Sequence, residues 1–485
     1  MSAVLEVNDS VADGGAAVGP TRALAQFIAS LEAASIPPAV RRVLENALVD
    51  AIGCGLHGAT TQWAHIVEEF AREQGGPPEA SFWASGGRKG SAANVVLSAG
   101  TAIHSFELDD HSRAKIHCGA VVVPVVLALG ERERISGARA LAAMAAGYEA
   151  MTRVSLGSNP GSARMRGWHL TGTCGSFGAA AAASVILGLD AETTASALGL
   201  AGTQSGGLWA FNADGAMSKR LHPGKAAQNG VMAALLARRG FHGPRYILEA
   251  RDGGFLRVMS DQCDSSEVTR ELGTAWRSEG ACFKPHACCG SNHACIDAAL
   301  ALARENRLDV RQIKRVVAGI GRVVETQTGF EYKPSTVLNA QMSLRYNLAV
   351  ALIDGRALLE QFTPERIAAP EVCELASRVS IEIDAEMDRL YPRLYAGIVH
   401  IEMQDGRRFT RRVDHSKGMP ENPMSSREID EKFLSLASAA VGPGQAKQVL
   451  ESARAAFEAP SIDELARSIG SPRLITRTAD DAPPP

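Results

Sequence analysis

The chain has 485 residues and a formal net charge of -3, with 46% hydrophobic and 21% charged residues. This is an ordinary composition for a folded globular protein, and it excludes the strong positive field that recruits nucleic acid. The N-terminal stretch lacks the basic and apolar layout of a secretory signal, and we expect no apolar run to reach the ~18–20 residues that span a bilayer. We therefore expect a cytoplasmic protein with no membrane partner.

In chain order, residues 1–20 are expected to be disordered, and residues 21–275 have the apolar spacing of helices. Val40, Leu44, Leu48 and Ile52 recur every fourth residue and form one apolar stripe. The runs "GAAAAASVILGL" and "AAQNGVMAALLARRG" repeat the theme with many small residues, which let helices approach one another closely. We predict that residues 21–275 form the first part of a helical domain.

Residues 276–415 have a different texture. The stretches "IKRVVAGIGRVVE" and "RVSIEID" are rich in β-branched residues, and "GIVHIEMQDGRRFTRRV" is typical of two strands joined at Asp405-Gly406. Helical patterns are interleaved with these stretches. We therefore predict an α/β lid domain here, followed by a C-terminal helical part over 416–475 and a disordered tail over 476–485.

The predicted fold class is mainly α with an inserted α+β domain: a large all-helical domain, built from both ends of the chain, carries a smaller α/β lid. Clefts between domains are common ligand sites, so we expect the functional site where the two meet. The nine cysteines are scattered along a long chain, which favours reduced, mostly buried thiols.

Ionisable side chains gather at five loop–helix junctions. The densest is "HSFELDDHSRAKIHCGA", from His104 to Ala120, which combines three histidines with Glu107, Asp109 and Asp110. The further candidates at the other junctions are His169; Lys219 and Arg220 with His222; Lys284 with His286 and His293; and Arg345 with Tyr346.

Several kinds of site are not indicated by the sequence. There is no G-x-S-x-G elbow, no P-loop and no G-x-G-x-x-G after a strand, so neither a serine nucleophile nor a nucleotide cofactor is predicted. The cysteines near His293 lack C-x-x-C spacing, and the first junction has no recognised ligand motif, so we predict no metal and no cofactor.

Acid–base chemistry on an anion remains. Removing a proton next to a carboxylate needs a positioned base and stabilisation of the developing dianion. Histidine titrates near neutral pH and suits the first role, whereas lysine, arginine and helix N-termini suit the second.

At these junctions the sequence resembles the MmgE/PrpD family, which includes 2-methylcitrate dehydratase, cis-aconitate decarboxylase and iminodisuccinate epimerase. The resemblance covers roughly residues 20–470 and is carried by five blocks in order: "HSFELDDH…IHCGAVVVPVVLALGE", "GWHLTGTCGSFGAAAA", "MSKRLHPGKAAQNGV", "FKPHACCGSNHACIDA" and "NAQMSLRYNLAVALIDG". It implies a homodimer of two-domain subunits and cofactor-independent chemistry on di- or tricarboxylic acids.

The resemblance also implies roles for individual residues. His117 and His169 match catalytic histidines, Lys219 and Lys284 match active-site lysines that bind carboxylates, and Tyr346 matches the family's tyrosine, which could protonate or orient a leaving group. The remaining candidates are Glu107 or Asp110, either of which would orient a histidine; His111, a second base; and Arg220 and Arg345, which would contact substrate.

The chain departs from the family pattern at four places. Glu107 replaces an Asp, His111 replaces a small hydroxyl residue, Cys118 follows His117 in place of Pro, and Arg220 follows Lys219 in place of Pro. A longer carboxylate and an added imidazole should reshape the pocket, so the resemblance fixes the scaffold better than the substrate.

Three functions are compatible with these residues. The first is a lyase that dehydrates or decarboxylates a small polycarboxylate, and the second is an epimerase that uses His111 and His117 on opposite faces. The third is a non-catalytic helical dimer that binds organic acids. In a blander interpretation, the first junction is only a charged loop, which suits Arg113 and Lys115 better than His117.

Overall fold

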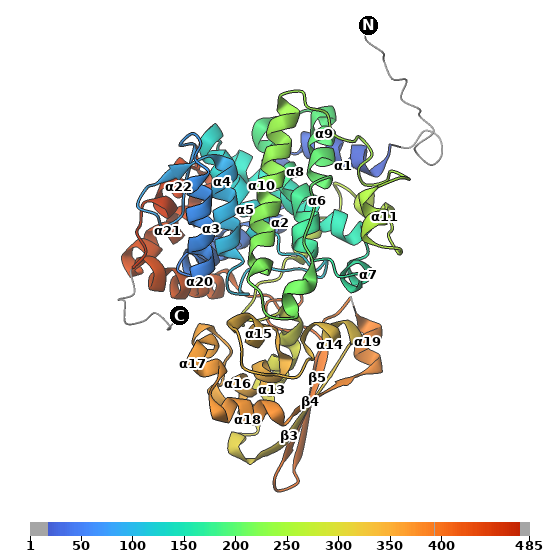
Figure 1. Ribbon diagram of the computed structural model, residues 1–485, viewed down its shortest axis with the longest axis vertical. Helices are drawn as coiled ribbons and strands as arrows, with labels where there is room; N and C mark the ends of the chain where they lie inside the picture. Colours follow the sequence, from blue (N-terminus) through green and yellow to red (C-terminus); the bar gives the residue numbers. More distant parts are fainter. Residues whose placement is uncertain (1–17, 392, 476–485) are drawn as a thin grey trace.

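The computed structural model describes residues 18–391 and 393–475, and it consists of a helical part and a smaller part around a mixed sheet (Figure 1). Of residues 1–20, which were predicted to be disordered, 1–17 lie outside the described residues. The disordered tail predicted over 476–485 lies outside them as well. The fold class predicted from the sequence is confirmed, whereas the domain boundaries near 275 and 415 stay predictions.

The helical part is built from both ends of the chain. Its N-terminal helices are α1 (Pro20–Ser30), α2 (Pro38–Gly58), α3 (Gln62–Glu73), α4 (Ala92–Ile103), α5 (Gly119–Glu133), α6 (Gly137–Gly157), α7 (Pro160–Met165), α8 (Leu170–Leu187), α9 (Ala191–Gly202), α10 (Ser218–Arg238), α11 (Phe255–Met259) and α12 (Ser266–Thr269). The C-terminal helices α20 (Ser426–Val441), α21 (Pro443–Ala455) and α22 (Asp463–Gly470) return to it, and α20 packs along α2 (Figure 1).

Helix α8 is the centre of the helical part and packs against α5, α6, α9 and α10. It is long and apolar enough to cross a membrane, which corrects the expectation that no apolar segment reaches that length, but 94% of it is buried inside the protein. It is therefore a core helix. Small residues permit its close contacts, since a Cβ added to Gly230 of α10 would overlap with Ala179 of α8.

The lid comprises α13 to α19 and a four-stranded sheet of order β4-β3-β5-β6. Its strands are β3 (Ile313–Ile320), β4 (Val379–Ile383), β5 (Gly397–Met403) and β6 (Arg408–Val413), and its helices are α13 (His293–Glu305), α14 (Arg322–Thr328), α15 (Val337–Met342), α16 (Leu344–Asp354), α17 (Pro364–Ile367), α18 (Pro370–Ser377) and α19 (Ala385–Leu390). Strands β3 and β4 are parallel and the other pairs are antiparallel. Helix α13 packs against β5 and β6, while α16 contacts β4.

Strands β5 and β6 form the hairpin predicted at Asp405-Gly406, with Ile398 opposite Arg412. Buried and half-buried residues alternate along β5, as expected for a strand with one face on the core. The stretch "IKRVVAGIGRVVE", rich in β-branched residues, is divided between β3 and α14, because residues 322–328 are helical. The Asp388 carboxylate accepts a hydrogen bond from the Arg322 backbone N–H at 2.8 Å, which stabilises the start of that helix.

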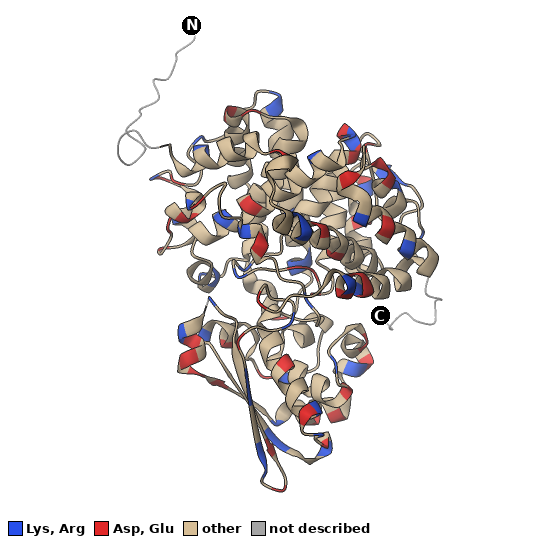
Figure 2. Cartoon of the chain, turned by 180° about the vertical axis from the view of Figure 1, so that it is seen from behind, with Lys and Arg blue, Asp and Glu red and all other residues tan. Residues whose placement is uncertain are grey.

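Charged side chains of both signs are interspersed over both parts of the molecule (Figure 2). This distribution agrees with the small net charge of -3. All nine cysteines lie within the described residues and are free thiols, six of them buried.

Candidate active site

A cavity with an empty volume of about 540 Å³ lies between the helical part and the lid. The segments that surround it include the loop 104–118 between α4 and α5, the N-termini of α8 and α10, and the loop 281–292 before α13. The polar residues in its lining include Glu107, His111, Lys115, His117, Arg164, His169, Lys219, Lys284, Ser291 and Gln327. Six site candidates from the sequence, far apart in the chain, therefore meet in one cavity: Glu107, His111, His117, His169, Lys219 and Lys284.

Contacts with the lid hold the loop 104–118 in place. The backbone of His111 pairs with that of Cys282, donating to its carbonyl at 2.9 Å and accepting from its N–H at 2.7 Å. The Gln341 side chain donates to the Phe106 carbonyl at 2.8 Å. Glu107 has a φ of 57°, in the left-handed region that few non-glycine residues occupy. The loop is therefore fixed by residues from both parts.

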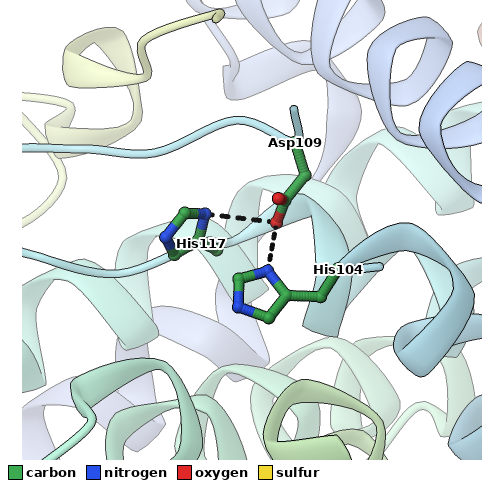
Figure 3. Close-up of side chains that lie close together, drawn as sticks. All are labelled: His104, Asp109 and His117. Atoms are coloured by element: carbon green, nitrogen blue, oxygen red, sulfur yellow. Dashed lines mark hydrogen bonds and ion pairs between the residues drawn. The ribbon is translucent and has the colours of Figure 1, made fainter. Parts of the chain in front are cut away.

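Asp109 orients two imidazoles beneath the cavity (Figure 3). Its Oδ2 lies 2.8 Å from His104 Nδ1 and 3.2 Å from His117 Nδ1. Burial raises the pKa of Asp109, but the two imidazoles outweigh it and the pKa falls well below its usual value. The carboxylate therefore stays ionised and favours the tautomer of His117 that carries its proton on Nδ1.

The second ring nitrogen of His117 points away from Asp109 (Figure 3). Burial and the nearby Lys284 lower the pKa of His117 to about 4, although Asp109 opposes the shift. At neutral pH the imidazole is therefore unprotonated, with the lone pair of Nε2 available to take a proton. His117 lines the cavity, which gives this lone pair access to a bound molecule.

His169 stands at the N-cap of α8 and lines another wall of the cavity. Its Nδ1 lies 2.8 Å from His222 Nδ1, so one of the two imidazoles donates and the other accepts. Burial, followed by the proximity of His222 and Lys219, lowers the pKa of His169 well below its usual value. His169 is thus a second neutral imidazole in the cavity at pH 7.

Lys219 and Lys284 share one carboxylate. Lys219, in the first turn of α10, forms a buried ion pair with Glu107, and Lys284 Nζ lies 3.6 Å from Glu107 Oε2 and donates to its backbone carbonyl at 3.0 Å. Burial raises the pKa of Glu107, but the two ammonium groups hold it well below its usual range. Two cations against one carboxylate leave positive charge for an incoming anion.

Asp110 and Arg220, two residues predicted to belong to the site, are not part of the cavity lining. Asp110 accepts hydrogen bonds from the Gly119 N–H and the Tyr148 hydroxyl, both at 2.8 Å, and so stabilises the start of α5. Burial and the nearby Asp109 raise its pKa to about 7. Arg220 donates to the Ser105 carbonyl at 3.1 Å and stacks on Trp63.

Tyr346 and Arg345 are not brought to the cavity either. The Tyr346 hydroxyl donates to the Gln361 carbonyl, and its ring is buried between Tyr332 and Phe362 in the lid. Arg345 points elsewhere, with an ion pair to Glu331 at 2.6 Å. The face of α16 that carries Tyr346 belongs to the core of the lid, so in this structure the expected contact of its phenol with a leaving group does not occur.

Sequence reasoning gave no role to several residues that the structure places at the site. His104 and Asp109 stand in the densest junction but were not assigned, because sequence cannot tell which of two adjacent aspartates faces the imidazoles. Arg164 and Trp209 line the cavity from segments with no motif. Gln327, from α14, reaches it from the lid.

His104, Asp109 and His117 offer ligand atoms within 4.8 Å of one another, a spacing at which they could hold a metal ion. The same positions are explained by one carboxylate oxygen of Asp109 that is hydrogen-bonded to His104 Nδ1 at 2.8 Å and lies 3.2 Å from His117 Nδ1. The expectation of metal-free chemistry stays a prediction, and its test is given below.

Comparison with known proteins identifies the family of the chain. Residues 22–267 match the MmgE/PrpD N-terminal domain, and residues 286–457 match the MmgE/PrpD C-terminal domain. The chain belongs to the MmgE/PrpD family.

Several relatives of the chain are named as cis-aconitate decarboxylases or as similar to them. The chain is 31% identical over 482 residues to a cis-aconitate decarboxylase-like protein, oryM, of Aspergillus oryzae, covering 95% of this chain and 98% of the relative. It is 30% identical over 461 residues to a cis-aconitate decarboxylase of Aspergillus terreus, covering 90% and 93%. The human cis-aconitate decarboxylase is 28% identical over 430 residues, covering 86% and 88%.

Proposed function

We propose that this protein is a cofactor-independent lyase that acts on a small polycarboxylate by proton transfer at a carbon next to a carboxylate. One observation carries the proposal: two neutral imidazoles, His117 and His169, face the same cavity as the ammonium groups of Lys219 and Lys284. A base without a cation would leave the developing charge unstabilised, and a cation without a base could only bind the acid. The cavity contains both.

The chemistry divides between these residues. Lys219 and Lys284 bind the carboxylate next to the reacting carbon, and their charge stabilises the enolate-like anion as it forms. In decarboxylation the C–C bond to the departing carboxylate breaks, carbon dioxide leaves, and the electron pair left on carbon takes a proton from an imidazole that has first been protonated from solvent. In dehydration an imidazole removes a proton and hydroxide leaves from the neighbouring carbon. His117, held by Asp109, is the first choice for the proton carrier.

Decarboxylation of cis-aconitate or a similar tricarboxylate is the first reaction to test, because that activity is named for relatives that align with most of the chain. Glu107 and His111 replace the family's usual residues within the cavity lining, so a different acid of the same class fits the proposal equally well. The protein is further proposed to be a cytoplasmic homodimer.

Epimerisation is the second candidate, and His111 favours it. The rings of His111 and His117 are 6.4 Å apart, and both residues line the cavity. Burial and Lys284 lower the pKa of His111 well below its usual value, so it too is an unprotonated imidazole at neutral pH. An imidazole on one face can remove the proton, and the other imidazole, once it has taken a proton from solvent, can return one to the opposite face.

Incubation of citrate-like, aconitate-like and aspartate-derived acids in deuterium oxide, followed by NMR, tests the proposal. A lyase releases carbon dioxide or forms an alkene with loss of water, and an epimerase exchanges the α-hydrogen with neither loss. A purely binding protein causes no turnover and no exchange with any acid. That result would contradict the proposal if the unmodified protein still bound an acid and the Lys219→Met variant did not.

A further inference from the structure

Arg164 is a buried cation without an acidic partner. It lies on α7, is only 6% exposed, and lines the cavity. Its guanidinium stacks on the Trp209 ring at 3.8 Å, but among the described residues its side chain has no ion pair or hydrogen bond. Other buried cations differ, since Arg153 contacts Glu149 at 2.8 Å and Lys432 contacts Asp50 at 2.7 Å. Burial of a guanidinium without a partner costs free energy unless an anion binds to it.

Lys115 is a half-buried cation in the same lining. Its ammonium lies over two lid aromatic rings, 4.7 Å from Tyr391 and 5.2 Å from Tyr395, and it contacts no carboxylate in the part of the chain that the structure describes. Its φ of 58° is in the left-handed region, so the backbone adopts an unfavourable conformation here. The position that sequence analysis treated as a charged loop residue therefore faces the site.

Burial affects both cations, and the charge of Arg164 also acts on Lys115. Burial lowers the pKa of Lys115 to about 7 with a further contribution from the charge of Arg164, and burial lowers the pKa of Arg164 to about 10. Like charges that are buried together without a carboxylate favour an anion between them. The other two cations, Lys219 and Lys284, already have an anion between them, which is the carboxylate of Glu107.

We propose that Arg164 and Lys115 form a second anion subsite, which binds a carboxylate of the substrate remote from the reacting carbon. The inference rests on the proposed function and narrows it. Among the described residues, four cationic side chains and one carboxylate line the cavity, and Arg164 and Lys115 are the two of these cations that have no carboxylate partner. That arrangement matches a tricarboxylate better than a dicarboxylate, and it gives Arg164 and Lys115 the task of selecting between them.

Calorimetric titration with two inert probes tests the subsite. Tricarballylate carries three carboxylates on a saturated chain, and succinate carries two. We expect Arg164→Met and Lys115→Met each to weaken tricarballylate binding at least tenfold while succinate binding changes less than twofold. Lys219→Met should weaken both acids. Arg164→Lys should restore most of the tricarballylate affinity because it returns the charge.

Arg166→Met is the matched control, because Arg166 is two residues away and pairs at the surface with Asp261. It should bind both acids as the unmodified protein does. If Arg164→Met binds tricarballylate normally while Lys219→Met does not, the subsite is overturned and the proposed function survives. If Arg164→Met weakens both acids equally with an unchanged melting temperature, the two subsites are not distinct and the inference is again overturned. If the unmodified protein binds neither probe, both the subsite and the proposed function fail.

Discussion

The helical part and the lid make different contributions to the cavity. The helical part supplies the imidazoles His117 and His169 and the ammonium of Lys219, whereas the lid and the loop that leads into it supply Lys284, Gln327 and Tyr395. Proton transfer is thus assigned to one part, while the charge that holds the anion is divided between both. The division implies that the site can bind and react only when the lid is packed against the loop 104–118.

The largest effect is expected from the base. His117→Asn keeps a side chain of similar shape but removes the titrating nitrogen, so kcat should fall by a factor of about 10²–10⁴. Steady-state kinetics on the acid identified by the NMR screen provide the measurement. His65→Asn, which changes an exposed residue of α3, is the control. Retention of more than a tenth of the activity by His117→Asn would assign proton transfer to another residue.

A smaller loss is expected from the lid's cation. Lys284→Met removes one charged partner of the substrate carboxylate and leaves Glu107 with Lys219 alone, so kcat/KM should fall by about 10- to 100-fold. The matched change in the lid is Lys314→Met, whose exposed ammonium pairs with Glu402. Equal kinetics for the two variants would show that the lid does not share in binding.

The pH dependence of stability should reflect the helical part. Burial is the main reason that the pKa values of His117 and His222 fall from 6.5 to about 4, and His104, His111 and His169 shift in the same direction. Between these values the unfolded chain binds more protons than the folded one, so stability is lost as the pH falls from 6.5 toward 4.

Asp110 opposes this trend, because its pKa is raised to about 7 and the folded state retains its proton. Burial also raises the pKa values of Asp50, Glu68 and Glu249, but the imidazoles named above shift in the other direction, and we expect a net loss of stability on acidification. Urea denaturation at pH 6.5, 5.5 and 4.5 measures it, and His222→Asn should reduce the slope. A free energy of unfolding that rises on acidification would show that the imidazoles are not buried as neutral groups.

A still smaller effect on catalysis is expected at Tyr346. Tyr346→Phe leaves the Gln361 carbonyl without its donor, which should lower the free energy of unfolding by about 1 kcal/mol. Because the phenol does not reach the cavity, kcat should change less than threefold. A loss of kcat greater than tenfold in a stable Tyr346→Phe protein would mean that the lid rearranges to bring this hydroxyl to the substrate.

No effect is expected from metal removal. Because Asp109 holds His104 by a hydrogen bond and His117 by a close ionic contact, dialysis against a chelator should leave kcat unchanged, and added divalent ions should not raise it. Activity that disappears on chelation and returns with one particular metal would establish an ion at these three residues.

The sequence was most informative where a local pattern decides the structure. The alternation along 397–403 and the Asp405-Gly406 turn predicted the lid hairpin, and clustered charges predicted the junctions that supply Lys219 and Lys284. It was less informative where a side chain's direction depends on tertiary packing. Tyr346 and His117 are both ionisable residues at junctions, yet only His117 faces the cavity, because the α16 face that carries Tyr346 packs inside the lid. Arg164 gave no signal at all, since its role comes from being buried without a partner.

The central claim is that residues from distant segments form one cavity that holds an anion next to a base. A crystal structure with bound tricarballylate tests it most directly. We expect one carboxylate within hydrogen-bond distance of Lys219 and Lys284, with the adjacent carbon facing His117 Nε2. A tricarballylate molecule bound elsewhere, with His117, His169 and the two lysines turned to separate surfaces, would contradict the account.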